Sequence, residues 1–324
     1  LIDIRVAGVI VSMATFLFLG VDFLRGPRRG PLFRLALWHF LALALLMVLF
    51  WPYLWSNPVG NLVEALTYSS FHGMAKGTAW AYNFKWIGLT TPPLYLLLCL
   101  AGLGRLGWRV LAPPHKWDAV RREGLALLFL LALPLLLPIV LGTQLFDGWR
   151  HHYFIWPPMV LLCLLGARWL LGLLPGRALK GAALLLLAAG LAWPAVFIYR
   201  NHPHEGMYYN ALAPKDGPKI RVNGSLDYWG LSYRALLEGI LAKDASPKLR
   251  VGYHNQPALA NVKVLPPQKR ARLEMVFHKQ VPEAKPEYFL TNFRWTEYVA
   301  RDFKGFLDKL GYREYLAVVV DGRK

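Results

Sequence analysis

Long apolar runs in the first 199 residues constrain this chain more than any other feature. There are six of them, each about 20 residues long, at positions 6–24, 35–55, 92–111, 124–142, 157–174 and 178–199. A helix of about 20 residues, rising about 1.5 Å per residue, crosses a hydrocarbon core of about 30 Å. The sequence therefore predicts a polytopic helical membrane domain with six spans.

The basic residues between the runs predict the orientation of these spans. They cluster in the first, third and fifth connections, as Arg25, Arg28, Arg29 and Arg34, then Arg105, Arg109, Lys116, Arg121 and Arg122, then Arg177 and Lys180. Connections rich in Lys and Arg stay in the cytoplasm. We therefore expect the second and fourth connections, and everything after the sixth span, to be extracytoplasmic.

The net charge of +18 raises the question of nucleic acid as a partner. Because the basic residues of the first half fall in short clusters between spans, they are explained by topology, and we expect membrane lipids and not nucleic acid around them. Cys99 and Cys163 both lie in apolar runs, so the sequence predicts neither a disulfide framework nor a cysteine metal site.

Residues 200–324 have the pattern of a small α/β domain, which places the domain border at 199/200. Apolar runs at 220–222, 249–253, 288–290 and 316–320 predict strands, and helical periods over 233–241 and 299–310 alternate with them. This alternation favours a small parallel or mixed sheet. No glycine-rich phosphate loop is present.

The fourth connection carries the strongest candidate site. It reads Asp147-Gly-Trp-Arg-His-His-Tyr-Phe-Ile-Trp156 and so places one arginine and two histidines among aromatic residues between two spans. Arg150, His151 and His152 have the donors that hold an anion such as a phosphate, and Trp149 and Tyr153 are suited to a lipid chain. In the alternative interpretation Arg150 pairs with Asp147 or a lipid headgroup, the histidines cap the loop, and the aromatic residues anchor it at the membrane interface.

The second connection, residues 56–91, is too long for a simple turn. Apolar residues at helical spacing over 62–69 predict a short amphipathic helix. Four residues that follow it mix aromatic groups with positive charge: His72, Lys76, Trp80 and Lys85. These residues are either an interfacial anchor or one wall of a substrate cavity that contacts lipid or acceptor.

A further polar segment, 201–210, follows the last run and contains His202, His204 and Glu205. Their spacing is not that of a helical ligand pair, so we predict no metal site and interpret the segment as docking the C-terminal domain onto the membrane domain.

The order of these motifs resembles the C-terminal part of bacterial membrane glycosyltransferases of family 39. These enzymes are similar to protein O-mannosyltransferases and lipid A aminoarabinose transferases and have the GT-C fold. The resemblance covers nearly the whole chain through short motifs beginning at Trp51-Pro-Tyr-Leu-Trp, Thr90-Thr-Pro-Pro-Leu, Asp147-Gly-Trp-Arg-His-His-Tyr, His202-Pro-His-Glu and Leu226-Asp-Tyr-Trp-Gly.

The resemblance implies an inverting transfer of a hexosyl or pentosyl group from a polyprenyl-phosphate donor to a protein, lipid or glycan acceptor. It also implies a multi-pass protein of the cell (inner) membrane with a periplasmic C-terminal domain. The lipid-linked sugar is the donor substrate, and we expect no cofactor and no divalent metal.

Family members place a catalytic acidic residue in the first extracytoplasmic loop. This chain opens Leu-Ile-Asp-Ile-Arg without an initiator Met, and Asp3 stands in the wrong place for that residue. We therefore expect the chain to be a C-terminal fragment that lacks the catalytic loop and is inactive alone.

Two other functions remain open. A membrane-anchored binding protein would recognise its ligand in a cleft of the α/β domain, whereas a transferase would have a polar cavity walled by both the 56–91 and 145–156 connections. A transporter would carry ionisable residues deep in its spans. Here the spans are almost free of charge, with His39 the main exception.

Overall fold

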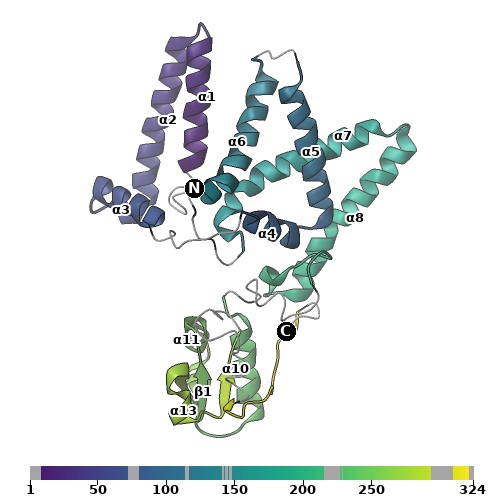
Figure 1. The fold of residues 1–324 in the computed structure, drawn as a ribbon. Coiled ribbons are helices and arrows are strands. Elements are labelled where there is room, and N and C mark those ends of the chain that lie inside the picture. The colour runs from purple at the N-terminus through teal and green to yellow at the C-terminus, as the bar shows by residue number, and fades with distance from the viewer. Residues whose placement is uncertain are drawn as a thin grey trace. The chain divides into compact units, whose positions relative to one another are not determined.

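The computed structural model describes residues 9–71, 80–113, 117–140, 142, 145, 148–214, 227, 229–292 and 309–320. These residues are mostly helical and include one small parallel sheet (Figure 1). The chain divides into two compact units. The first unit contains Leu1–Gly88 and Pro93–Leu184, and the second contains Leu89–Pro92 and Leu185–Lys324. The predicted border at 199/200 lies close to the end of helix α8 (Arg177–Asn201), which contributes residues to both units.

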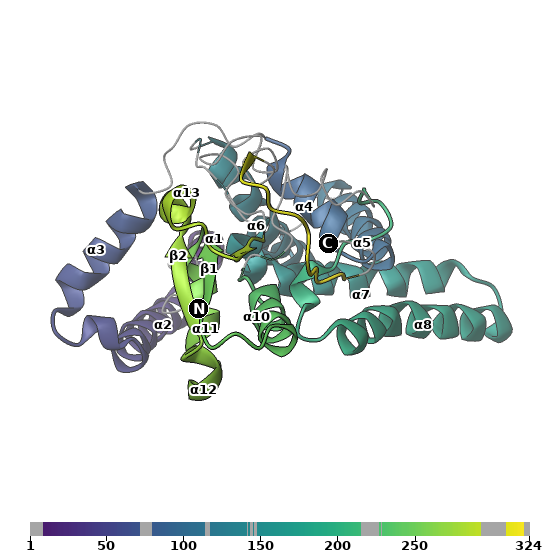
Figure 2. The same ribbon diagram turned by 90° about the horizontal axis from the view of Figure 1, so that it is seen from below.

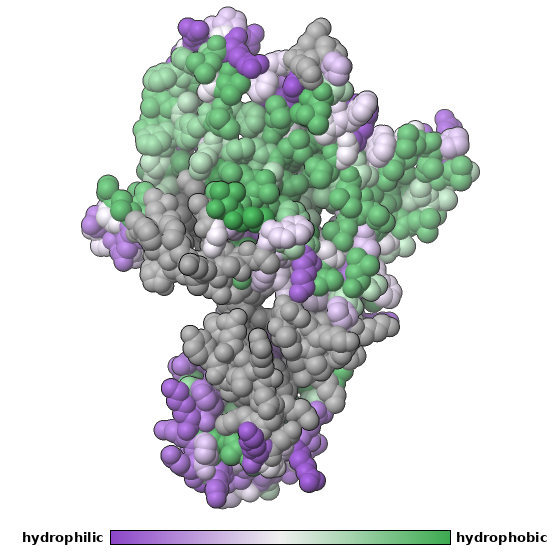
Figure 3. Space-filling view, viewed as in Figure 1, coloured by the Kyte–Doolittle hydropathy of each residue, from purple (hydrophilic) through white to green (hydrophobic). Residues whose placement is uncertain are grey.

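Among the described residues, five helical segments are long and apolar enough to cross a membrane. They are α2 (Arg29–Phe50), α5 (Pro93–Leu111), α6 (Ala119–Val140), the segment His152–Leu173 that ends in α7 (Trp156–Leu173), and α8. A further helix of 17 residues, α1 (Val9–Arg25), covers the first predicted span. Hydrophobic residues cover the visible face of these helices (Figure 3). The prediction of a membrane protein is therefore confirmed.

The first unit is held together where α5 crosses α7. A Cβ atom added to Gly102 would lie 1.9 Å from the carbonyl oxygen of Leu162, and one added to Gly166 would lie 2.0 Å from that of Leu98. Only glycine allows the two backbones to approach so closely, which is a common solution for helices packed in lipid. α2 and α3 (Pro58–Phe71) lie at one edge of this unit, away from α5 and α7 (Figures 1 and 2).

Two shorter helices, α3 and α4 (Tyr82–Thr90), form most of the described part of the second connection. A single turn, η2 (Pro52–Leu54), lies just before it, because α2 ends at Phe50 and not at residue 55 as predicted. The amphipathic helix predicted over 62–69 is confirmed as part of α3. Asn57 starts α3, because its side-chain Oδ1 accepts a hydrogen bond from the Gly60 N–H at 3.1 Å.

The α/β part of the second unit is built on a three-stranded parallel sheet of order β2-β1-β3. Its strands are β1 (Leu249–Tyr253), β2 (Leu273–Phe277) and β3 (Tyr288–Leu290). Its helices are α10 (Ser232–Lys243), α11 (Gln256–Lys263), α12 (Pro267–Arg270), η5 (His278–Gln280) and α13 (Val281–Ala284). The predicted strands at 249–253 and 288–290 and the predicted helix over 233–241 are confirmed.

The core of this sheet and its helices is apolar. Tyr233 and Leu237 of α10 and Val251 of β1 are fully buried. Removing such side chains from water contributes roughly 1.5–3 kcal/mol each. The amphipathic stripe of α10 is therefore explained by one face packed on β1.

The strand expected at 316–320 is wrong. This segment forms no ladder beyond a single bridge at Val320, although Leu316 packs against the apolar core. The sheet instead contains β2, which pairs with β1 on the side opposite to β3; the sequence analysis missed it because exposed Glu274 interrupts its apolar character. Strand formation requires a hydrogen-bonding neighbour, and apolar β-branched composition alone does not supply one. The strand predicted at 220–222 and the helix predicted at 299–310, apart from its last residues, lie outside the described residues.

Candidate functional site

The candidate loop folds as a tight turn leading into α7. Gly148 has a backbone φ of 71°, a conformation that favours glycine, and η3 (Arg150–Ile155) follows it directly. The His152 N–H donates to the carbonyl oxygen of Trp149 at 2.8 Å. Proline in the first turn of α7 needs no amide hydrogen bond there, so the sequence Trp-Pro-Pro starts the helix immediately after the turn.

Aromatic packing fixes this turn on the helix that it begins. Trp149 is only 7% exposed, and its ring lies 5.0 Å from that of Tyr153 and 5.8 Å from that of Trp156. Trp156 in turn lies 6.3 Å from Tyr95 of α5. Trp149 is therefore a packing residue of the turn, whereas Tyr153 is 61% exposed and presents its ring outward.

The three predicted phosphate ligands have different surroundings. His152 is 6% exposed, with its ring 6.1 Å from that of Phe154, and Arg150 is half-buried. Both residues take part in further interactions within the protein, although the Arg150 Nε and the His152 Nδ1 are buried without a hydrogen-bond partner among the described residues. His151 belongs to η3, but its side chain lies outside the described residues.

The structure brings the second and fourth connections into contact. The Gly148 N–H donates to the hydroxyl oxygen of Tyr82, the first residue of α4, at 3.1 Å. One helical turn further on, Trp86 is 3% exposed and lies 6.1 Å from the Tyr82 ring. The Lys85 Nζ lies 5.4 Å from the Trp86 ring centre, an arrangement that stabilises the ammonium group over the aromatic face.

The other predicted residues of the second connection do not join this contact or cannot be placed. Trp80 is 72% exposed. His72 and Lys76, together with Asp147 of the fourth connection, lie outside the described residues. Of the predicted residues in the second connection, only Lys85 is thus seen beside the contact between the connections.

Sequence reasoning missed Asn83, which lies between Tyr82 and Trp86 on α4. It is 2% exposed, and its Oδ1 accepts no hydrogen bond within the described part of the chain. Leaving a buried acceptor unsatisfied costs about 1–3 kcal/mol, so such an atom often marks a binding site. The only sequence signal was one amide among apolar and aromatic neighbours.

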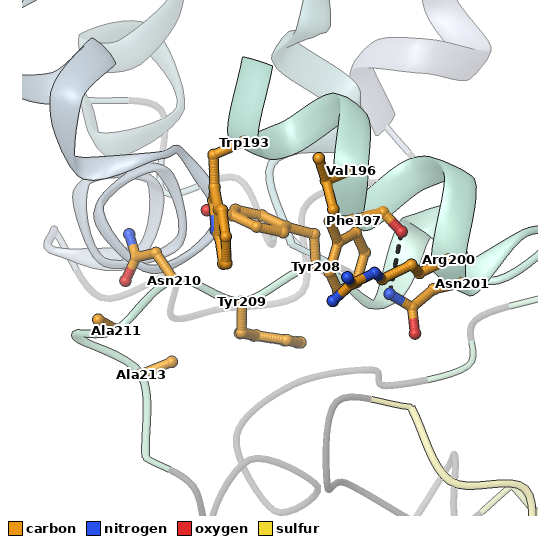
Figure 4. Close-up of a pocket in the computed structure, with 10 residues that line it drawn as sticks. All are labelled: Trp193, Val196, Phe197, Arg200, Asn201, Tyr208, Tyr209, Asn210, Ala211 and Ala213. Atoms are coloured by element: carbon orange, nitrogen blue, oxygen red, sulfur yellow. Dashed lines mark hydrogen bonds between the residues drawn. The ribbon is translucent and has the colours of Figure 1, made fainter. Parts of the chain in front are cut away.

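A cavity of about 270 Å³ lies in the second unit, where α8 ends (Figure 4). α8 contributes Trp193, Val196, Phe197, Arg200 and Asn201, and the segment after it contributes Tyr208, Tyr209, Asn210, Ala211 and Ala213. This segment belongs to the motif 201–210. The sequence analysis marked the motif but did not predict a cavity.

Asn210 holds the second wall of this cavity in place. It is 3% exposed; its backbone N–H donates to the carbonyl oxygen of Leu89 at 2.9 Å and its Nδ2 to that of Thr91 at 2.6 Å. Its Oδ1 accepts from the Leu212 N–H at 2.9 Å. The Leu89–Pro92 segment belongs to the same compact unit as Asn210, so these bonds hold the wall within the second unit, and the docking predicted for 201–210 stays a prediction.

The acidic residue of this motif pairs locally. The His202 Nδ1 hydrogen-bonds the Glu205 carboxylate. The backbone N–H of Glu205, followed by the His202 ring, holds the pKa of that carboxyl below its ordinary value. In the described part of the chain, no group of three His, Cys, Asp or Glu side chains gathers to hold a metal ion.

Comparison of the chain with protein-family models, curated proteins and solved structures gave no match. The resemblance to family 39 glycosyltransferases therefore stays a prediction, and the geometry of the site has to support any function by itself.

Proposed function

We propose that this chain belongs to an integral-membrane glycosyltransferase that moves a sugar from a polyprenyl-phosphate donor to an extracytoplasmic acceptor with inversion. The observation that carries the proposal is the hydrogen bond from Gly148 to Tyr82. It joins the two connections that the arginine distribution predicts on the outer face, directly beside Arg150 and the buried Asn83.

For this function, the region around Arg150 must bind the phosphate of a lipid-linked sugar. Arg150 stands two residues before the apolar segment His152–Leu173, and a span beginning there would hold Arg150 at the level of the lipid phosphates. Its planar guanidinium group can hold two phosphate oxygens, and the histidines His151 and His152 add donors. As the donor bond breaks, the departing phosphate gains negative charge, which these groups stabilise.

The remaining roles follow from exposure. Lys85 and Tyr153 are exposed and suited to the rim of the site, as is Trp80 if it faces the same opening. Trp149 is buried against Tyr153 and Trp156, so we assign it a packing role in the turn that carries Arg150 and His152. The catalytic acid stays unassigned, and the acceptor is a protein, lipid or glycan.

Binding of a polyprenyl phosphate and sugar transfer from a polyprenyl-phosphate sugar test the proposal separately. Arg150→Lys keeps the positive charge but loses the planar guanidinium group that can hold two phosphate oxygens. The affinity for a polyprenyl phosphate and the rate of sugar transfer should therefore both fall. Losing such a charged hydrogen bond costs roughly 2–4 kcal/mol, or about 30-fold to 1000-fold in rate. His152→Ala should act in the same direction, and Arg28→Lys in the first connection serves as the control. Normal donor binding by a folded Arg150→Ala protein would contradict the assignment.

Sidedness has its own test. With both native cysteines replaced, Lys285→Cys should react with a membrane-impermeant maleimide added to intact cells, while Arg28→Cys should be protected. Labelling of Arg28→Cys together with protection of Lys285→Cys would mean that the predicted orientation of the spans is inverted.

The cavity at the end of α8 favours a second candidate, a membrane-anchored binding protein. In that case a ligand would bind at the second unit, and Arg150 variants would not affect it. A full chain that binds no polyprenyl phosphate, yet binds an extracytoplasmic ligand through residues of this cavity, would favour the second function.

A further inference from the structure

The face of α8 that lines the cavity changes in chemistry along the helix. Trp193, Val196, Phe197, Arg200 and Asn201 are spaced i, i+3, i+4, i+7 and i+8, which places them on one face. Reading towards the C-terminus, this face is aromatic and aliphatic first, then cationic and polar. A ligand lying along it would need a hydrocarbon part and an anionic part, in that order.

The length of α8 places this change at the membrane interface. Its 25 residues extend about 38 Å, which exceeds a hydrocarbon core of about 30 Å by roughly one and a half turns. The ends of the helix therefore reach the headgroup layers. Trp193 and Val196 then lie near the edge of the hydrocarbon, and the long side chain of Arg200 lies among the lipid phosphates.

Arg200 has a charge that the described residues do not neutralise. Its side chain is exposed and forms no ion pair or hydrogen bond with another described residue. The nearest acid in the sequence, Glu205, pairs with His202 instead. The cation that lines the cavity is thus available to an external anion.

The opposite wall is already in place before any ligand arrives. Asn210 uses its backbone N–H, its amide N–H and its carbonyl oxygen within the protein, as described above. Tyr208 packs edge-on against Phe197 with ring centres 5.0 Å apart. A preformed wall lowers the entropy cost of binding.

From this geometry we propose that the cavity binds the phosphate headgroup of an anionic membrane lipid. Arg200 pairs with the phosphate, and the lipid chain runs along Trp193, Val196 and Phe197. About 270 Å³ is slightly below the usual range for small-molecule pockets, so the cavity suits a headgroup and leaves the chain outside on the helix. This inference does not depend on the proposed transferase function, because none of its residues belongs to the Arg150 site.

The test uses the full chain in detergent, titrated with short-chain phosphatidylglycerol and, separately, with inorganic phosphate. Arg200→Gln should weaken phosphatidylglycerol binding about tenfold or more, as expected for a lost charged hydrogen bond. Ala211→Phe keeps Arg200 but places a ring at the edge of the cavity, and should weaken binding as well. Arg177→Gln is the matched control, because it removes an exposed charge from the other end of the same helix.

Three results would overturn the proposal. Equal weakening by Arg177→Gln and Arg200→Gln would show general attraction between a basic protein and anionic lipid. Inorganic phosphate binding as tightly as the lipid would show a free-anion site. Unchanged lipid binding in both Arg200→Gln and Ala211→Phe would leave Arg200 as a residue that only complements the negative end of the α8 dipole. The transferase proposal is tested with a polyprenyl phosphate and Arg150 variants, and this one with phosphatidylglycerol and Arg200 variants, so failure here and failure of the transferase proposal are distinguishable.

Discussion

The two units use the same apolar residue types in opposite ways. In α2 no residue is buried, and side chains such as Leu45 (67% exposed) and Phe50 (65% exposed) point away from the protein. In the α/β part, Leu237 and Val251 are fully buried against their neighbours. Lipid solvates leucine as well as the protein interior does, so burying leucine contributes little to the folding of a membrane-spanning helix and much more to the folding of the α/β part.

This difference shows what must hold each unit together. The membrane helices depend on close backbone packing at glycines and on a few polar contacts at helix ends. The α/β part depends on its core and on polar side chains that satisfy buried or terminal backbone groups. The predictions below test this distinction, from the largest expected effect to the smallest.

The largest effect is expected at the α5–α7 crossing. Gly102→Ala adds a methyl group where a Cβ would lie 1.9 Å from the Leu162 carbonyl oxygen, so the helices must separate. We expect a loss of roughly 3 kcal/mol in thermal unfolding experiments, the upper end for overpacking.

Gly104→Ala provides the matched control in the same helix. No atom lies within 4 Å of a Cβ added there, so the substitution should stabilise α5 by up to about 1 kcal/mol. If Gly102→Ala and Gly104→Ala behaved alike, the crossing would not be the feature that holds the first unit.

The next effect concerns the C-terminal end of α10. The Arg272 guanidinium donates to the carbonyl oxygens of Leu241 at 3.1 Å and Ser246 at 2.8 Å, and also to that of Asp244. Arg272→Ala should therefore destabilise the α/β part by about 2 kcal/mol, measured as faster amide exchange in α10 and β1. Arg270→Ala, which removes one long bond of 3.5 Å to Lys263, should change exchange little. Equal exchange in the two variants would contradict this role of Arg272.

A smaller effect is expected at the polar contact between α1 and α6. Asp22 accepts hydrogen bonds from the Trp117 Nε1 at 2.8 Å and from Arg122 at 3.1 Å, and it is only 18% exposed. Asp22→Asn should lower the free energy of unfolding by about 1 kcal/mol. Glu123→Gln removes a second, highly exposed partner of Arg122 and should have no measurable effect. If Glu123→Gln lowered the free energy of unfolding more than Asp22→Asn, the burial of the acidic partner would not determine how strongly each acid stabilises its pair with Arg122.

The smallest effect is a pH dependence confined to the α/β part. Burial raises the pKa of the Glu287 carboxyl, but hydrogen bonds from its own backbone and from Arg250 outweigh this and hold the pKa below its ordinary value of 4.5. A carboxyl whose pKa is lower in the folded than in the unfolded chain stabilises the folded state at any pH above its unfolded pKa. This stabilisation is lost as the pH falls through the pKa of the folded state. Amide protection in β1 should therefore decline below about pH 4.5, and less so in Glu287→Gln. Because Glu287 is exposed, the change should be small, and an equal decline in α5 would contradict its assignment to this residue.

Sequence reasoning predicted the site only in part, because it has no means of telling which polar residues become buried. The stretch Trp149 to Tyr153 was recognisable from its unusual composition between two apolar runs. Its internal arrangement was not, because Trp149 and His152 turn inward while Tyr153 turns outward within a single turn of 3₁₀ helix. Asn83 and the α8 cavity were missed for the same reason, since burial depends on neighbours that are distant in sequence.

The sequence alone determined the apolar helices, the α10 stripe and two of the strands, because these follow from the spacing of residues within one segment. Tertiary structure alone decided three features. It paired β1 with β2 and left 316–320 with no more than one bridge, it placed Gly102 against Gly166, and it joined Gly148 to Tyr82 across 66 residues. Each of these depends on contacts between segments, and the free energy of such a contact belongs to the pair and is not encoded in the pattern of either segment.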